Sequence, residues 1–382
     1  MHHALRILAW SALAGCAATA SAQSAVTIYG SLDQYLNYMR SSSGTTVRSL
    51  EDGALLRSRI GFRGTEDLGG GYAAKFTLEG GFNADNGTQG DSTRLFDRQA
   101  WVGLASPFGE LRFGRQNGSV FRQGGYIDYT TRTMGSMVNN FGVPSRWDND
   151  ISYTTPVLFG GLVVDVHYAL SEQSPAAGGN RQSVFQTGAD YTVGPFVVGA
   201  ATVRAKPAKT GPLGKSAFYD HAFFNWNYGQ GKVYLTYVRS NNSTSSGTGA
   251  TLINNGGALL NGTGNGFVAG TDANVDRVYH IWQVSADYRL TEQLRVGGLI
   301  GRINDRSSSN DAVGGSLGAY YDLSKRTTLM ALWDTIRNKG DQVTGAGFRL
   351  AASGAVKTNF TTANDVNGRR INGVQLGVLH RF

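Results

Sequence analysis

The feature that most constrains this chain is an alternation of apolar and polar residues, which recurs in stretches of about 9–12 residues. In one stretch the apolar residues Leu162, Val164 and Val166 alternate with Asp165 and His167. Successive side chains of a β-strand point to opposite faces, so each stretch predicts a strand with one apolar and one polar face. A soluble β-sandwich has the same period, so the connections must distinguish the two folds.

The connections between these stretches alternate between short and long. The short ones are 66–70, 106–109, 194–195, 229–231 and 323–326, and the long ones are 40–50, 83–93, 118–147, 171–182, 240–275 and 338–368. Tight turns at one end and long polar loops at the other are typical of outer-membrane barrels. Counting the stretches from Val26 to Phe382 predicts an all-β fold, a sixteen-stranded antiparallel transmembrane β-barrel.

The composition agrees with a barrel and disfavours a helical membrane protein. The chain has 382 residues, with 53 glycines and 7 prolines, and its mean hydropathy is −0.23. Few prolines suit a sheet, because proline cannot donate to a strand ladder. No apolar run after residue 22 approaches the ~18 residues that a transmembrane helix needs. The net charge of +8 comes without a basic helix or an aromatic-interleaved Lys/Arg cluster, so we expect no nucleic-acid partner.

Residues 1–22 predict a cleaved signal peptide. Arg6 gives a positive start, an Ala-rich apolar run follows, and 20–22 reads Ala-Ser-Ala, a cleavage site of the A-x-A kind. The mature domain 23–382 then contains no cysteine, because Cys16 is removed. A second interpretation is a lipoprotein box, since the sequence Leu-Ala-Gly-Cys ends at Cys16 and would leave a lipid on that residue.

Five segments spread over almost the whole mature chain carry a family resemblance. They are VTIYG at 26–30, SRIGFRGTEDLGGG at 58–71, RQAWVGL at 98–104, FGRQ at 113–116 and HRF at 380–382. In this order they resemble the general porins of Gram-negative outer membranes, of the β-proteobacterial type. The resemblance implies a homotrimer of barrels whose third external loop folds inward, leaving a water-filled channel for passive diffusion of small hydrophilic solutes and ions.

The same resemblance implies a location in the cell outer membrane and further partners. The C-terminal Phe382 is similar to the signal that the barrel-assembly machinery recognises. Outer-membrane lipid surrounds such a barrel. The excess of arginine is compatible with a solvated surface or with lipopolysaccharide contact from outside.

Three arginines of one predicted strand point toward the channel. Arg57, Arg59 and Arg63 lie two or four residues apart, so we expect them on one face. Their neighbours Ile60 and Phe62 are apolar, which assigns the opposite face to lipid or to a subunit contact. A guanidinium in hydrocarbon near the midplane costs about 2–4 kcal/mol, so the arginines should face the lumen. For Arg57 and Arg63, a rim position near water without a role in selection remains an equal alternative.

The resemblance extends this set to a channel constriction. Arg59 and Arg98 match wall arginines of such porins, and the inward loop corresponds to 118–147. This loop departs from the enterobacterial pattern, because it carries one internal acid against three arginines. The expected constriction residues are Arg57, Arg59, Arg63, Arg98, Arg122, Arg132, Arg146 and Asp128.

The surplus of arginine at the constriction predicts a preference for anions. The lumen acids Glu79, Asp33 and Asp165 oppose this preference, and Lys75 on the face of Glu79 partly offsets it. A general diffusion channel and a channel that prefers small organic anions are both compatible with this pattern.

Arg115 is a separate case, because its register with Leu111 and Phe113 turns it outward, where a lone charge is costly. A subunit contact with Asp85 or Asp91 of a neighbouring copy would remove the conflict. The sequence therefore predicts Arg115 at the subunit contact.

No motif indicates an enzyme, a cofactor site or a metal site. We expect His167, His221, His280 and His380 to be lumen or interface residues. An adhesin or a barrel enzyme acting through the external loops is the alternative from a different functional class.

Overall fold

The computed structural model describes residues 25–130, 133–170, 183–206, 217–240, 267–268, 278–305, 311–339, 350–351, 360, 363–366 and 368–382. The expected signal peptide, Cys16 and Arg132 lie outside these residues. Among the described helices, none is long and apolar enough to cross a membrane.

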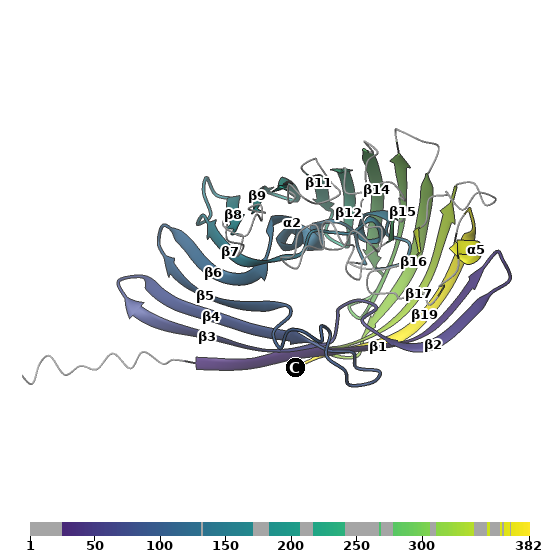
Figure 1. The fold of residues 1–382 in the computed structure, drawn as a ribbon, viewed down its shortest axis with the longest axis horizontal. Coiled ribbons are helices and arrows are strands. Elements are labelled where there is room, and N and C mark those ends of the chain that lie inside the picture. The colour runs from purple at the N-terminus through teal and green to yellow at the C-terminus, as the bar shows by residue number, and fades with distance from the viewer. Residues whose placement is uncertain are drawn as a thin grey trace, which may run out of the picture.

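Nineteen strands and four short helices make up the described structure (Figure 1). The strands are β1 (Ala25–Ser41), β2 (Thr46–Asp52), β3 (Arg59–Gly69), β4 (Tyr72–Gly81), β5 (Gln99–Ser106), β6 (Gly109–Asn117), β7 (Arg146–Thr154), β8 (Leu162–Ala169), β9 (Ser183–Val193), β10 (Phe196–Lys206), β11 (Ala217–Asn227), β12 (Lys232–Ser240), β13 (Phe267–Val268), β14 (Tyr279–Arg289), β15 (Leu294–Asp305), β16 (Ala312–Asp322), β17 (Thr327–Asn338), β18 (Leu350–Ala351) and β19 (Arg370–Arg381). The helices are α2 (Ser119–Arg122), η1 (Gln123–Tyr126), α3 (Met137–Phe141) and α5 (Ala363–Val366).

One antiparallel sheet closes on itself and forms the barrel. Its 17 strands pair in chain order, and β1 pairs with β19, so the sheet has no free edge. β2 and β3 pair one after the other with the same neighbour β1, so together they fill one place in the wall. The expected sixteen-stranded barrel is therefore confirmed. Figure 1 shows the purple β1 beside the yellow β19.

The wall has an apolar outer face and a polar inner face. On β1 the outward side chains Ile28, Leu32 and Leu36 are exposed, whereas the inward side chains Asp33 and Asn37 are buried. The same alternation runs through the other wall strands, as in the exposed Trp333 and the buried Asp334 on β17. An apolar band facing outward matches a barrel in lipid, as the alternation in the sequence predicts.

Two connections differ from the sequence prediction. The predicted turn at 66–70 is instead the end of β3, and the chain reverses at 70–71. Gly69, Gly70 and Gly71 have φ values of 80°, 61° and 82°, which only glycine adopts at little cost. The predicted long loop 40–50 is a four-residue connection, because β1 and β2 extend their pairing from Arg40 to Thr46.

Asp33 explains why the second wall strand is interrupted between β2 and β3. Its carboxylate accepts hydrogen bonds from the backbone N–H groups of Ala54, Leu55 and Leu56, at 3.2, 2.7 and 2.7 Å. The backbone N–H of Asp33 in turn donates to Ser58 Oγ at 2.9 Å. These bonds satisfy backbone N–H groups that have no partner in a neighbouring strand, so the segment 53–58 is held at the inner wall.

Candidate functional site

The connection between β6 and β7 contacts the inner wall on the side of β8 and β9. Ser119 of α2 donates a short hydrogen bond to the Asp165 carboxylate. Arg122 donates from Nε to Asp165 at 2.6 Å and pairs through Nη1 with Asp190, also at 2.6 Å. Tyr126 stacks on the ring of Phe223 of β11, with ring centroids 4.8 Å apart.

The same connection reaches strands much later in the chain. Tyr129 Oη lies 3.2 Å from Ser316 Oγ of β16, and the backbone N–H of Gly135 donates to Asp334 of β17 at 3.0 Å. A side chain at Gly135 would collide with the backbone carbonyl of Gly315, so glycine permits the close approach. The described residues of this connection, 118–130 and 133–145, thus contact inward-facing residues from β8 to β17.

Asp128, the expected constriction acid, is buried and serves as an internal anchor of this segment. Its carboxylate accepts hydrogen bonds from Thr130 Oγ1 at 2.7 Å, from Ser136 Oγ at 2.7 Å and from Gln283 Nε2 at 2.8 Å. Gln283 lies on β14, so the anchor joins the loop to the wall. The Asp128 charge is therefore held within a hydrogen-bonded cluster.

Arg59 and Arg98, the two arginines that the resemblance assigns to the wall, lie together and share one carboxylate. Arg98 donates from Nε to Glu79 Oε1 at 2.6 Å, and Arg59 Nη1 lies 3.9 Å from the same oxygen. Tyr29 donates from its hydroxyl to the other oxygen of Glu79 at 3.0 Å. Arg63 is exposed to solvent, and its guanidinium lies 5.1 Å from the centre of the Tyr29 ring.

Arg57 lies in the interruption 53–58 and not in a strand, contrary to the one-strand argument. It nevertheless joins the same cluster, because a Cβ at Gly81 would lie 3.2 Å both from Arg57 Nε and from Arg98 Cδ. Asp97 bonds to the Gly81 backbone N–H at 2.6 Å and is an acid of this region that the sequence analysis missed. Its position at the end of a connection gives no alternation from which its direction could be read.

Arg146 is buried at the start of β7. Its guanidinium lies 4.4 Å from the centre of the Phe121 ring in α2, so it joins the wall to the segment 118–145. The positive charge of Arg146 also attracts the Glu79 carboxylate. The structure therefore brings Arg57, Arg59, Arg63, Arg98 and Arg146 into one region, while Arg122 lies apart on the side of β8 and β9.

Arg122 belongs to a second charged group that includes residues the sequence analysis did not foresee. Burial of the Arg122 guanidinium opposes its charge, but Asp165 and Asp190 outweigh burial and raise its pKa. His167 lies between Asp150 and Asp165, at 2.7 and 3.2 Å. Arg122 and His167, two inward-facing groups, thus bind three acids on β7, β8 and β9.

Arg115 has a partner within its own chain. It lies at a bulge, where the register of β6 and β7 shifts between Gly114 and Gln116. Its Nη1 pairs with Asp148 at 2.6 Å, and Asp148 also pairs with Arg94 at 2.8 Å. The argument from a lone outward charge is therefore wrong, and a subunit contact at Arg115 stays a prediction.

Phe382 closes the wall. Its backbone exchanges two hydrogen bonds with Gly30 of β1, at 3.1 and 3.2 Å, and its ring lies over this glycine. His167 and His221 are buried on the inner face, whereas His280 and His380 lie outward beside Tyr237 and Thr327.

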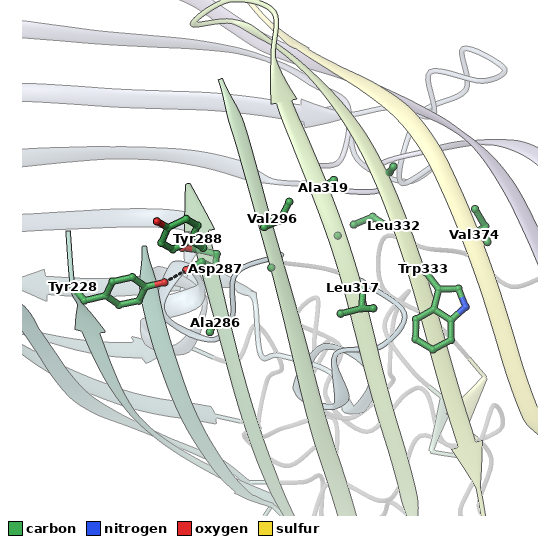
Figure 2. Close-up of a pocket in the computed structure, with 13 residues that line it drawn as sticks. Tyr228, Ala286, Asp287, Tyr288, Val296, Leu317, Ala319, Leu332, Trp333 and Val374 are labelled. Carbon is green, nitrogen blue, oxygen red and sulfur yellow. Dashed lines mark hydrogen bonds between the residues drawn. The ribbon is translucent and has the colours of Figure 1, made fainter. Parts of the chain in front are cut away.

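The outer wall contains a groove of about 650 Å³ across β14 to β19 (Figure 2). Leu317, Trp333 and Val374 line it, and Tyr228 donates a hydrogen bond to the backbone carbonyl of Asp287 at its edge. These side chains belong to the outward apolar face, so the groove is separate from the lumen.

The comparisons with known proteins agree with this architecture. The Gram-negative porin family matches residues 9–341. An outer membrane porin protein of Bordetella pertussis is 30% identical, over 87% of this chain and 94% of its own length. Outer membrane porin protein 32 of Delftia acidovorans is 27% identical, over 98% and 99%. The anion-selective porin from Comamonas acidovorans has a similar structure, with a TM-score of 0.71, 23% identity, and coverage of 94% of this chain and 100% of that chain.

Family membership accounts for both the closed barrel and its apolar outer band. It places the barrel in the cell outer membrane. A protein of this kind holds a water-filled passage inside its wall. The chain belongs to the Gram-negative porin family.

Proposed function

We propose that this chain is a passive channel for small hydrophilic solutes that prefers anions, and that residues 118–147 narrow its lumen. The observation that carries the proposal is the pair of arginines, Arg59 and Arg98, that share the single carboxylate of Glu79. Arg63 adds an exposed positive charge at the ring of Tyr29, which bonds to the same carboxylate. A narrow passage lined by one sign of charge concentrates the opposite ion.

The contacts of the segment 118–145 support a role in narrowing the channel. It is joined to β8 through Asp165, to β14 through Gln283 and to β17 through Asp334. A segment held at several points along the inner wall reduces the open cross-section of the barrel. The segment and the wall arginines would then form the narrowest part together, because Arg146 packs on Phe121.

Further parts of the proposal come from the family. Residues 1–22 are removed as a signal peptide, and 23–382 assemble as a homotrimer. The barrel-assembly machinery recognises Phe382, lipopolysaccharide contacts the outside, and the chain carries out no catalysis. The position of Phe382 in the last rung of the wall supports a role in assembly.

A reversal potential across a planar bilayer with a KCl gradient at low ionic strength tests the ion preference. We expect chloride to cross more readily than potassium, and the Arg59→Ala, Arg98→Ala double variant to lose most of this preference. A potential that shows potassium crossing more readily would refute anion preference. An unchanged selectivity in the double variant would refute the assignment of the two arginines.

A further inference from the structure

A second groove, of about 620 Å³, lies on the outer wall across β9 to β14. Its floor consists of Ala189, Ala200 and Ala222, which the strand register places side by side. Larger outward side chains stand on both sides of this floor. They are Tyr191, Val198, Phe224, Leu235, Tyr237 and Trp282. The floor is low because three neighbouring strands carry only a methyl group there.

A row of charged and polar residues lies directly beyond the groove, toward the ends of the strands that lead into the long connections. Asp220, Arg239 and His280 are register partners on β11, β12 and β14, each two residues beyond Ala222, Tyr237 or Trp282. Arg204 of β10 lies two residues further along its strand than Thr202, the partner of Asp220. These side chains continue the outward face of the groove.

Two arginines in this row are held in place but remain open to solvent. Arg204 pairs with Asp220 at 2.7 Å, and Arg239 lies 3.9 Å from the other oxygen of that carboxylate. Both guanidinium groups lie over the Phe218 ring, at 5.5 and 4.9 Å from its centre. Their side chains are 48% and 49% exposed. Two positive charges share one negative charge, so the pair has capacity for a further anion.

The dimensions match one leaflet of a membrane. Six residues separate Val198 in the groove from Arg204, which is about 20 Å along an antiparallel strand. At the usual strand tilt of ~45° this corresponds to about 14 Å along the membrane normal, close to half of a ~30 Å hydrocarbon core. An acyl chain that lies in the groove would therefore reach the surface of the leaflet beside the two arginines.

We propose that this groove and the arginine pair bind one lipid of the outer leaflet, with an acyl chain over Ala200 and Ala222 and a headgroup phosphate on Arg204 and Arg239. Guanidinium groups bind phosphate through short charge-assisted hydrogen bonds. An apolar groove that ends in two exposed arginines is complementary to a phosphorylated amphiphile, the chemistry of the lipid part of lipopolysaccharide. The inference deepens the proposed contact with lipopolysaccharide and does not depend on the ion preference of the channel.

Native mass spectrometry of the full protein in an uncharged detergent, titrated with bis-phosphorylated lipid A, tests the site. We expect the Arg204→Ser, Arg239→Ser double variant to bind about tenfold more weakly, because charge-assisted bonds are lost. Lipid A without its phosphates should bind the original protein as weakly as the double variant does. Ala222→Trp, which fills the groove, should also weaken lipid A binding.

Arg48→Ser is the matched control. Arg48 lies on β2 at the same end of the barrel, and its guanidinium is 5.9 Å from the centre of the Tyr38 ring. Among the described residues, no carboxylate links Arg48 to a second arginine. We expect its lipid A affinity to stay unchanged, and heat-dependent gel mobility verifies that each variant is folded.

Equal lipid A affinity in the double variant, or an equal loss in Arg48→Ser, would overturn the site. So would a change of oligomeric state with unchanged lipid affinity, because the groove would then contact a second copy. The reversal potential of the double variant should equal that of the original protein, so failure of the lipid site is distinguishable from failure of the anion channel.

Discussion

Arg98 donates a hydrogen bond of 2.6 Å to the carboxylate of Glu79. The same carboxylate is 3.9 Å from Arg59, so a single acid stands between two guanidinium groups on the inner wall. The negative charge of Glu79 therefore offsets only one of these two positive charges, and one positive charge of the three side chains stays uncompensated.

Replacing Glu79 with glutamine should strengthen the anion preference. The amide keeps an acceptor for Arg98 but removes the negative charge that Arg59 and Arg98 share. We expect the chloride-to-potassium permeability ratio to rise about twofold at ~0.1 M salt and to converge on the original value near ~1 M, where the Debye length shortens to about 3 Å. Reversal potentials at the two salt concentrations measure this.

Glu110→Gln is the control for this variant. Glu110 pairs with Lys75 at 2.8 Å and with Arg112, but it lies at the start of β6, away from the arginine cluster. We expect a small effect on selectivity. A Glu79→Gln channel with the original permeability ratio would contradict the role given to the shared carboxylate.

Asp128→Ala should release the segment 118–145 from the wall without unfolding the barrel. The substitution removes the acceptor for Thr130, Ser136 and Gln283, and hydrogen bonds to a buried charge are each worth about 1.5–3 kcal/mol. We expect a larger and noisier single-channel conductance and faster tryptic cleavage within 118–145. Asp128→Asn, which keeps one acceptor oxygen, should have a smaller effect, and a conductance equal to the original in Asp128→Ala would argue against the anchor.

Asp148→Ala should destabilise the folded barrel more than the double variant Arg115→Ala, Asp148→Ala. The single substitution leaves Arg115 and Arg94 without their shared carboxylate on the outward side. Because both partners of the 2.6 Å pair are partly exposed, we expect a loss of roughly 1–3 kcal/mol. Urea unfolding followed by tryptophan fluorescence measures it. Dissociation of trimers in Arg115→Ala, at unchanged barrel stability, would instead support the predicted subunit contact.

The connection between β4 and β5 should lose a stabilising interaction only in strong acid. Burial opposes the charge of Asp91, but hydrogen bonds from Thr93 and the ion pair with Arg94 outweigh burial and lower its pKa to about 2. A depressed carboxyl pKa stabilises the fold above the ordinary pKa of ~3.9, and this contribution disappears as the pH falls toward ~2. An NMR titration of the Asp91 carboxyl carbon should show the midpoint near 2.

Thr93→Val should raise the Asp91 midpoint toward ~3.9, because it removes the hydroxyl donor 2.6 Å from the carboxylate. Thr93→Ser, which retains the hydroxyl, should leave the midpoint low. Identical midpoints in the two variants would show that Thr93 does not set the pKa.

The wall of the barrel could be predicted from the sequence because its signal is local. Apolar and polar side chains alternate within each strand, so the number of strands and the lumen position of Arg59 follow from neighbouring residues. The conformations of the connections were harder to predict. Arg57 leaves the strand because Asp33, more than twenty residues earlier, binds the backbone of 54–56.

Arg115 and Asp128 illustrate two other reasons why the partner of a side chain could not be predicted from the sequence. A bulge at Gly114, with φ of 120°, shifts the register and brings Arg115 next to Asp148. A strict alternation of inward and outward side chains does not predict this contact. Asp128 takes its wall partner Gln283 from a strand 155 residues later, and no local pattern reports such a contact. The acids Asp97 and Asp190 were missed because a carboxylate beside a turn or within an apolar stretch gives little indication of its partner.

The pairing of β1 with β19 also has a consequence for the order of events in folding. Gly30 exchanges two backbone hydrogen bonds with Phe382, one donated and one accepted, so the first wall strand has an exposed edge until the last strand pairs with it. Such an edge is a template for pairing with other chains. Closure over so great a sequence separation is intrinsically slow. The chain therefore passes through a long period in which it must be kept apart from its own copies, and the final residue ends that period.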